Sequence, residues 1–336
     1  MKPENDLLSL NNLARNVLLQ YDIDPDKISV IQNNGLKTVW KITQGPESKC
    51  LKRLKQNKEK ALFTVGAQIY IAQAGGAVPQ VYLNREGNPV TEYMEQIFVL
   101  YEWIEGRDFS FARPADLRLA LEGLAKFHVS SRGYTAPEGA KVSSKLGRWP
   151  HQYESMMSRM LKWKNEAAAK TENAVYKSYC RYIDAIAEMG NKALEALLKS
   201  SYSKLTDIAP EQSALCHQDY GEGNAILQGD TVYVLDLDGI TYDLPVRDLR
   251  KIIGKRMEKL GRWDKKVIED ILLWYEKNNE LSSEEKELLK IDLLFPHRFF
   301  GTVKNLFKKN KVLAPGEIIR IGEFELAKTD VLNDLF

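Results

Sequence analysis

The feature that most constrains the fold is a short ribbon near residue 230. Two runs, 225–228 and 231–235, are rich in β-branched, aliphatic and aromatic side chains, and Gly229 and Asp230 lie between them. Two residues of this kind are typical of a tight turn between antiparallel strands. The sequence therefore predicts a β-hairpin whose register is set by its turn.

The open end of this hairpin is expected to collect oxygen-bearing side chains. Counting back from the turn, Asn224 faces Leu235, so Asp236 is the next residue along. Opposed Cα atoms in such a ribbon lie about 4.5–5.5 Å apart, and a diagonal neighbour is still within reach of a shared ion. Asp219 lies five residues before Asn224, in a loop that contains Gly221 and can turn tightly. We therefore expect Asp219, Asn224 and Asp236 to converge.

These three groups suit the transfer of a phosphoryl group from a metal-bound nucleotide. That reaction needs a carboxylate to hold the acceptor hydroxyl, and oxygen ligands to hold Mg²⁺ on the phosphates. His217, Asp219 and Asn224 are followed by Asp236 twelve residues after Asn224, in the order that the reaction needs. The alternative is that each residue is an ordinary loop carboxylate or amide, since Asp and Asn are common near turns. The combined spacing favours the site, and its structural context is the test.

The composition is typical of a globular protein with a large core. At 336 residues, with 44% hydrophobic and 28% charged residues, the chain can form two lobes. A net charge of +2 gives no reason to expect nucleic-acid binding. No apolar run is long enough to span a membrane, and the first residues lack a signal-peptide pattern, so synthesis in the cytoplasm is expected. Three widely spaced cysteines fit a reducing compartment better than a disulfide framework or a zinc site.

The pattern of elements changes about one third of the way along the chain. Residues 7–20 and 58–74 carry helical patterns. Strands are expected at 28–31, 38–42, 49–52, 81–83, 89–91 and 97–103. After Gly106 helices are expected at 114–131, 150–170, 173–199, 245–259, 264–278, 283–295, 298–309 and, more briefly, 326–335. The sequence predicts a two-lobed α+β fold, with an N-terminal lobe over 1–104 and a helical C-terminal lobe over 105–336 that carries the hairpin.

Several stretches together resemble the aminoglycoside phosphotransferase and choline kinase branch of the protein-kinase-like fold. They are 51–53, 78–81, 100–106, 124–128, 217–224, 234–238 and 247–249. Within that branch, 127–131, 216–220 and 243–249 look most like the bacterial spore-coat S/I protein family. The resemblance implies a kinase-like fold with a small β-rich N-terminal lobe and a large helical C-terminal lobe. It also implies a place in the spore coat.

The resemblance implies roles for residues of the hairpin and of the N-terminal strands. Asp219 matches the catalytic aspartate that orients the substrate hydroxyl, and Asn224 and Asp236 match the Mg²⁺ ligands. Lys52 matches the lysine that contacts the α- and β-phosphates. Its strand lies in a basic run, so it also fits a solvated surface charge, and the alternation along 50–53 does not choose a face. His217 is expected to pack or hydrogen-bond within its loop.

The resemblance also implies a second segment, which would contact the nucleotide base. Glu102 to Ile104 match the hinge, an extended backbone whose N–H and C=O groups would face an adenine edge. Both Glu102 and Ile104 fit equally well as the end of a strand before a turn at Gly106.

Two departures from the pattern bear on activity. The loop 32–38, which would cover the nucleotide, has a single glycine. The helix over 58–74 should supply an acid to pair with Lys52, but its only acid is Glu59 at the start. Gln68, nearer the middle, could donate a hydrogen bond but could not neutralise the lysine.

Two functions follow from the sequence. The first is a phosphotransferase that uses ATP, or another nucleoside triphosphate, with Mg²⁺ and acts on an alcohol group of an unknown small molecule. The alternative is a catalytically weak or inactive kinase-like protein that assembles with other spore-coat proteins. Nucleic-acid binding through the basic runs at 262–266 or 308–311 is the weakest reading, because short basic runs are usually solvated helix faces.

Overall fold

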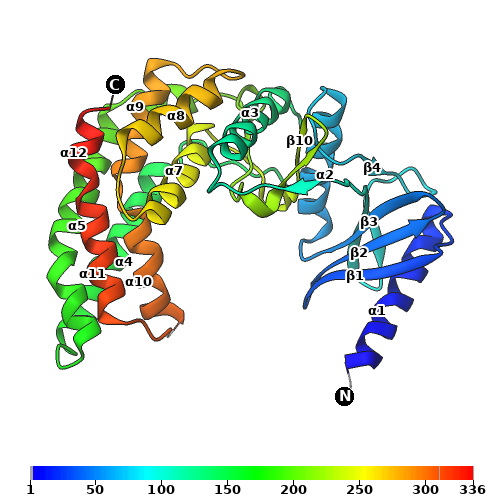
Figure 1. Cartoon of the computed structure of the whole chain (residues 1–336), viewed down its shortest axis with the longest axis horizontal. Coiled ribbons are helices and arrows are strands. Elements are labelled where there is room, and N and C mark those ends of the chain that lie inside the picture. The colour runs from blue at the N-terminus through cyan, green and yellow to red at the C-terminus, as the bar shows by residue number, and fades with distance from the viewer. Residues whose placement is uncertain (1–2, 310, 336) are drawn as a thin grey trace. The chain divides into compact units, whose positions relative to one another are not determined.

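A computed structural model describes residues 3–309 and 311–335 of the chain (Figure 1). The chain divides into two compact units. One comprises Met1–Ser144 and His217–Tyr242, and the other comprises Lys145–Cys216 and Asp243–Phe336. The hairpin therefore belongs to the same unit as the N-terminal strands, although they are far apart in sequence. The lobe boundary at residue 104 stays a prediction.

An antiparallel sheet forms the base of the first unit. Its order is β1 (Lys27–Asn34), β2 (Lys37–Gln44), β3 (Glu47–Leu54), β6 (Gln96–Glu102) and β4 (Val81–Tyr82), with β5 (Thr91–Tyr93) also paired to β6. Gly35 and Gly45 take left-handed backbone angles, φ 65° and 57°, at the two tight turns that join β1 to β2 and β2 to β3. Each strand predicted over residues 28–103 overlaps one of these strands.

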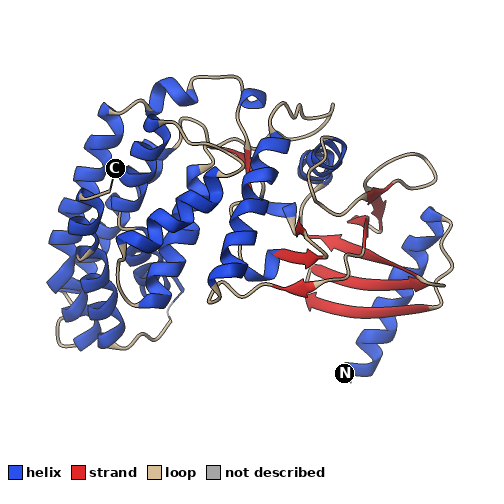
Figure 2. Ribbon diagram, turned by 45° about the horizontal axis from the view of Figure 1, so that its top comes forward, coloured by secondary structure: helices blue, strands red, loops and turns tan. Residues whose placement is uncertain are grey.

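Two helices cover opposite faces of this sheet. Helix α1 (Pro3–Leu18) lies across one face, as Figure 2 shows, and packs its Val17 into a core that includes Leu51. Helix α2 (Lys58–Gln73) packs its Val65 into a second core with Leu54. Because successive side chains of a strand point to opposite faces, Lys52 lies on the α2 side of β3. The sheet thus settles the face that the sequence left open.

The predicted hairpin completes the first unit. Strands β9 (Ala225–Gln228) and β10 (Thr231–Val234) form a small sheet with β7 (Arg107–Asp108), in the order β10-β9-β7. Helix α3 (Pro114–Ser131) packs on β10. A Cβ atom at Gly123 of α3 would come within 2.7 Å of the Val232 side chain, so this close approach requires glycine.

The second unit is helical. Figure 1 shows α4 (Trp149–Ala168), α5 (Ala174–Lys199), α10 (His297–Lys309) and α11 (Pro315–Leu326) running alongside one another. The remaining helices are α6 (Tyr202–Thr206), α7 (Val246–Leu260), α8 (Lys265–Glu276), α9 (Ser283–Leu294) and α12 (Lys328–Asn333). The long helices predicted from the sequence are confirmed to within a few residues. No helix in the described part of the chain combines the length and the apolar character that crossing a membrane requires.

Helix α11 was not predicted. It begins at Pro315. Proline lacks a backbone N–H, and it fits the first turn of a helix because the N–H groups there have no partner within the helix. The Glu317 carboxylate accepts a bond of 2.7 Å from the Ala314 N–H at this end. Gly322 in the middle weakens the helical signal, yet a Cβ there would come within 2.6 Å of the Tyr182 ring. Close packing on α5 therefore explains why glycine occupies this position, although glycine weakened the prediction of a helix.

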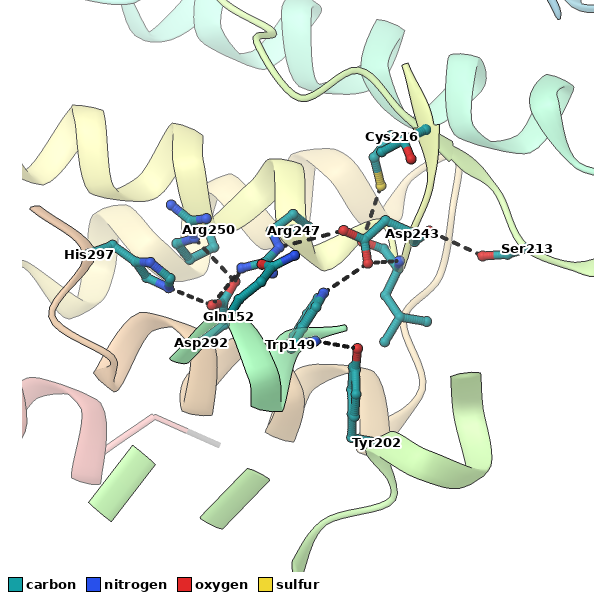
Figure 3. A network of polar contacts seen from close by, with 12 residues as sticks. Trp149, Gln152, Tyr202, Ser213, Cys216, Asp243, Arg247, Arg250, Asp292 and His297 are labelled. Atoms are coloured by element: carbon teal, nitrogen blue, oxygen red, sulfur yellow. Dashed lines mark hydrogen bonds and ion pairs between the residues drawn. The ribbon is translucent and has the colours of Figure 1, made fainter. Parts of the chain in front are cut away.

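A buried ionic network fastens the helices of the second unit (Figure 3). Asp292 of α9 is fully buried and lies at its centre. Its carboxylate accepts bonds from Arg247 Nη1 at 3.0 Å and Arg250 Nε at 3.1 Å. His297 Nε2, at 2.6 Å, and Tyr153 Oη, at 2.5 Å, complete the set. Helices α4, α7, α9 and α10 thus share one carboxylate.

This network predicts the sign of a pH dependence. Burial lowers the pKa of His297 from 6.5 to about 3, and Arg250 adds to the effect. Burial alone would raise the pKa of Asp292, but Arg247 and Arg250 hold it well below its ordinary value. A depressed histidine pKa gives stability that is present above pH 6.5 and lost as the pH falls toward 3. The carboxylate works in the same direction below its ordinary pKa.

We therefore expect His297 to lower the free energy of unfolding by up to about 1.4 kcal/mol per pH unit on acidification below pH 6.5. Urea unfolding measured at several pH values, on the parent and on His297→Gln, checks this. The variant should show a shallower slope. Equal slopes in the two proteins would exclude His297 as a source of the pH dependence.

Candidate functional site

The hairpin has the predicted register. Gln228 lies opposite Thr231, and Leu235 N donates to Asn224 O at 3.0 Å. Gly229 takes a left-handed backbone angle, φ 57°, in the two-residue turn. The turn chemistry therefore places Asn224 and the residue after Leu235 at one end of the ribbon, as the sequence indicated.

Asp236 has an unusual backbone conformation. Its φ of 59° and ψ of 61° lie in the left-handed region, which only a few per cent of residues other than glycine adopt, asparagine and aspartate more often than most. This bend separates β10 from a short 3-10 helix, η4 (Leu237–Gly239). Residues held in such conformations gather at functional sites, where the surrounding structure supports them.

Two lysines and two aspartates form a compact cluster beside this bend. Lys52 Nζ lies 2.7 Å from Asp236 Oδ1 and 2.7 Å from Asp238 Oδ1. Lys37 Nζ lies 2.8 Å from Asp236 Oδ2 and 3.3 Å from Asp238 Oδ2. We call these four residues the lysine–aspartate cluster. Lys52 is only 7% exposed, so its ammonium group is largely shielded from water and is held by these contacts.

The cluster keeps Asp236 ionised. Burial by itself would raise the pKa of this carboxyl, but Lys52 and Lys37 lower it, and the pKa ends well below the ordinary value. Burial would lower the pKa of Lys37, but its hydrogen bond to Asp236 raises it above the ordinary value. Asp236 is thus available as an anionic ligand at any physiological pH.

A cavity of about 300 Å³ opens beside the cluster, within the first unit. Lys37, Lys52, Asn224 and Asp236 contribute polar groups to its lining. The other lining residues are Ile31, Gln32, Val39, Cys50, Gln68, Pro79, Tyr101, Glu102, Trp103, Ile104, Gly223, Ile226, Leu235 and Leu237. Apolar walls with a few convergent polar groups are typical of small-molecule sites. The volume and the mixed lining suit a flat base with a charged tail.

Both predicted hinge residues line this cavity. The Glu102 N–H donates to Gln80 O at 2.8 Å, and the Gln80 N–H donates to the Glu102 carboxylate at 3.2 Å. Since the Glu102 N–H is already used, a base would have to meet other backbone groups of this segment, such as those of Ile104. Cys50 lies in the wall, and burial raises the pKa of its thiol to about 11, so it remains protonated.

The loop before the hairpin is braced by a histidine. His217 is 1% exposed, and its Nδ1 accepts from the Asp219 N–H at 3.3 Å. Nε2 therefore carries the hydrogen, and it lies 2.8 Å from Leu235 O, to which it donates. Both ring nitrogens are engaged in holding the loop to the hairpin. The expectation that His217 hydrogen-bonds within this region is confirmed.

The three predicted polar residues are placed differently. Asn224 and Asp236 both line the cavity. Asp219 is exposed and, in the described part of the chain, is not one of the lining residues. Its backbone oxygen accepts a bond of 2.8 Å from Asn224 Nδ2. The structure thus brings the two predicted metal ligands into one cavity and ties Asp219 to them through its backbone.

The donor set fits a hard divalent cation. Asp236 offers carboxylate oxygens, and Asn224 donates one hydrogen bond through its amide nitrogen to the backbone oxygen of Asp219, which leaves the amide oxygen for a cation. Oxygen ligands of these two kinds are the ones that Mg²⁺ and Ca²⁺ prefer.

Two members of the cluster were missed or undervalued from the sequence. Lys37 was read only as part of the loop over 32–38, although it shares a strand face with Val39 by alternation. Asp238 was included only as the last residue of the stretch 234–238. Gln68, weighed as a partner for Lys52, instead donates to Pro79 O at 2.6 Å.

Comparison with known protein families shows to which family the chain belongs. Residues 16–315 match the family described as "Spore coat putative kinase YutH". The chain belongs to this YutH family. It is also 25% identical to spore coat protein S of Bacillus subtilis (strain 168) over 299 residues, which cover 89% of this chain and 85% of that protein. The resemblance to spore-coat kinase-like proteins drawn from the sequence is therefore confirmed.

Solved structures show which fold this member of the YutH family has. An aminoglycoside phosphotransferase from Alicyclobacillus acidocaldarius superposes with a TM-score of 0.73 at 13% identity, covering 95% of this chain and 92% of that one. An amicoumacin kinase bound to AMP-PNP and Ca²⁺ gives 0.62 at 15% identity, covering 96% and 94%. A microcompartment-associated aminopropanol kinase gives 0.57 at 14% identity, covering 96% of each chain. The α+β kinase-like fold of aminoglycoside phosphotransferases is confirmed.

Proposed function

We propose that this chain is a phosphotransferase that uses ATP, or another nucleoside triphosphate, with Mg²⁺ to phosphorylate a hydroxyl group of a small molecule. The cavity that combines apolar walls with Lys52, Asn224 and Asp236 carries this proposal. The amicoumacin kinase was solved with AMP-PNP, and a spectinomycin phosphotransferase of the same fold was solved with ADP. Family membership supports the spore coat as the location.

In this mechanism the chain mainly positions charges. The apolar walls would hold the base, with the segment from Glu102 to Ile104 along its edge. Lys52 and Lys37 would contact phosphate oxygens, and Asn224 and Asp236 would hold the cation. When bound, Mg²⁺ would offset charge on the phosphate oxygens.

Asp219 would act on the acceptor. Its carboxylate would accept a hydrogen bond from the acceptor hydroxyl and orient the oxygen toward the γ-phosphorus. A new bond would form from this oxygen to phosphorus while the bond to the bridging oxygen of the leaving diphosphate breaks. The hydroxyl proton would pass to Asp219. Positioning and electrostatics supply most of the rate enhancement in such transfers.

Nucleotide binding is the first test. A ligand that binds only the folded protein adds about 2.7 kcal/mol of stability at one hundred times its Kd. We therefore expect millimolar ATP with Mg²⁺ to raise the melting temperature by several degrees, and ATP with EDTA to raise it less. No shift in a folded sample would contradict the proposal.

Asp236→Asn is the matched variant for this test. Asparagine tolerates the left-handed backbone that Asp236 adopts, so the fold should be retained. The variant loses the anionic ligand, and its melting temperature should respond much less to added Mg²⁺ with ATP. A response equal to that of the parent would exclude Asp236 as a ligand.

A structural role in the coat is the second candidate function, and the names of the family and of its Bacillus relative favour it. Such a role would be played together with other coat proteins. It requires no turnover, so it predicts that coat assembly is indifferent to the loss of Asp219.

A further inference from the structure

Lys52 has no acidic partner on helix α2. In the described part of that helix the only acid is Glu59, in the first turn. Gln68 is buried, and its amide donates to Pro79 O. The carboxylates that hold Lys52 come instead from the hairpin side, from Asp236 and Asp238, each at 2.7 Å.

These two aspartates have different surroundings. Asp236 lines the cavity together with Asn224, whereas Asp238 is not one of the described lining residues. Asp238 lies on η4, and its side chain is 24% exposed. If Asp236 held a cation, Asp238 would remain as a carboxylate partner for Lys52.

Asp238 is also tied to α2. Its backbone oxygen accepts a hydrogen bond from the Gln56 side-chain amide. The amide oxygen of Gln56 accepts in turn from the Thr64 hydroxyl of α2, at 3.2 Å. The segment that carries Asp238 is therefore fixed to the helix from which the expected acid is missing.

We propose that Asp238 is the positioning residue for Lys52 and substitutes for the acid that α2 lacks. An ammonium group has three N–H donors. One bonded to Asp238 keeps the nitrogen at the polar end of the cavity, and the others remain for phosphate oxygens. This inference rests on the proposed function, because it assigns a phosphate-binding role to Lys52.

The test is the ATP affinity of Asp238→Asn, measured by calorimetry at saturating Mg²⁺. Loss of one charged hydrogen-bond partner of Lys52 should weaken ATP binding about tenfold. The Mg²⁺ concentration that half-saturates binding should not change, because Asp238 acts through Lys52 and not through the metal. Asp230→Asn is the matched control: Asp230 is an exposed aspartate at the hairpin turn, and its loss should leave ATP binding unchanged.

A double-mutant cycle separates positioning from a general structural effect. Because Asp238 also lies 3.3 Å from Lys37, the cycle is made in a Lys37→Met background. Once Lys52 is also replaced by methionine there, Asp238→Asn should cause no further loss of ATP affinity, since coupled residues are not additive. If Asp238→Asn alone does not fold, the variant that carries all three substitutions is compared with Lys37→Met/Lys52→Met. Equal ATP affinities support the inference, and weaker binding by the variant that also carries Asp238→Asn overturns it.

Three other results would also overturn the inference. One is an Asp238→Asn protein that binds ATP as well as Asp230→Asn does. Another is a shift in the Mg²⁺ requirement of Asp238→Asn, which would make Asp238 a metal ligand. If the parent binds no ATP at all, the proposed function and this inference fail together. If the parent binds ATP and Asp238→Asn is unaffected, only the inference fails.

Discussion

Replacing Asp219 with asparagine should lower kcat for phosphoryl transfer by about 10²–10⁴-fold, the range expected for loss of a group that takes a proton from the acceptor. ATP binding should stay close to that of the parent, because Asp219 is exposed and is not one of the described residues that line the cavity. ADP formation, followed over a panel of amino alcohols and polyhydroxylated acceptors, gives the measurement. Asp230→Asn, with the same change of charge, should be as active as the parent.

The same variant separates the two candidate functions. An Asp219→Asn protein that forms ADP as fast as the parent would remove Asp219 from the mechanism. If the parent yields no ADP with any acceptor, and both proteins enter the spore coat equally, the structural role is favoured. An active parent with an inactive variant supports the phosphotransferase.

Replacing Asp292 with alanine should lower the free energy of unfolding by about 3–5 kcal/mol, the cost of removing one partner of a buried ionic network. The substitution leaves the guanidinium groups of Arg247 and Arg250 without the carboxylate that they share. It also removes the acceptor of the Tyr153 hydroxyl. Urea unfolding followed by circular dichroism should show the loss as an earlier transition of the helical unit.

Asp184→Ala is the control for this experiment. Asp184 pairs with Lys164 on the surface, and its side chain is 71% exposed. Exposed pairs of this kind contribute about 0–1 kcal/mol. A loss at Asp292 no larger than the loss at Asp184 would contradict the stabilising role of the network.

The sequence predicted best where the physics is local. The two-residue turn at Gly229 and Asp230 set the hairpin register, and with it the neighbourhood of Asn224 and Asp236. The helical spacing of apolar residues is also a local pattern, and it predicted α3, α4, α5 and α7 to α10. Helix α11 was not predicted because Gly322 interrupts the helical pattern in the sequence. Its close packing on Tyr182, which explains the glycine, is visible only in the structure.

The sequence predicted least where the cause is a distant contact. Leu51 and its neighbours alternate ambiguously, and the packing of α1 and α2 on the sheet shows which face of β3 holds Lys52. Lys37 and Asp236 are 199 residues apart, so nothing local marks them as partners. Lys52 proved to have carboxylate partners, but they lie 184 and 186 residues away and not on the helix where the pattern led us to expect an acid.

The split of the first unit into two stretches of chain has a consequence for biosynthesis. A ribosome that has released only the first 144 residues has made Lys52 and the hinge segment, but neither Asn224 nor Asp236. The intervening part of the helical unit is translated before the second wall of the cavity exists. Chains that end before Asn224 therefore lack the second wall of this pocket, and a minimal expression fragment would have to contain both 1–144 and 217–242.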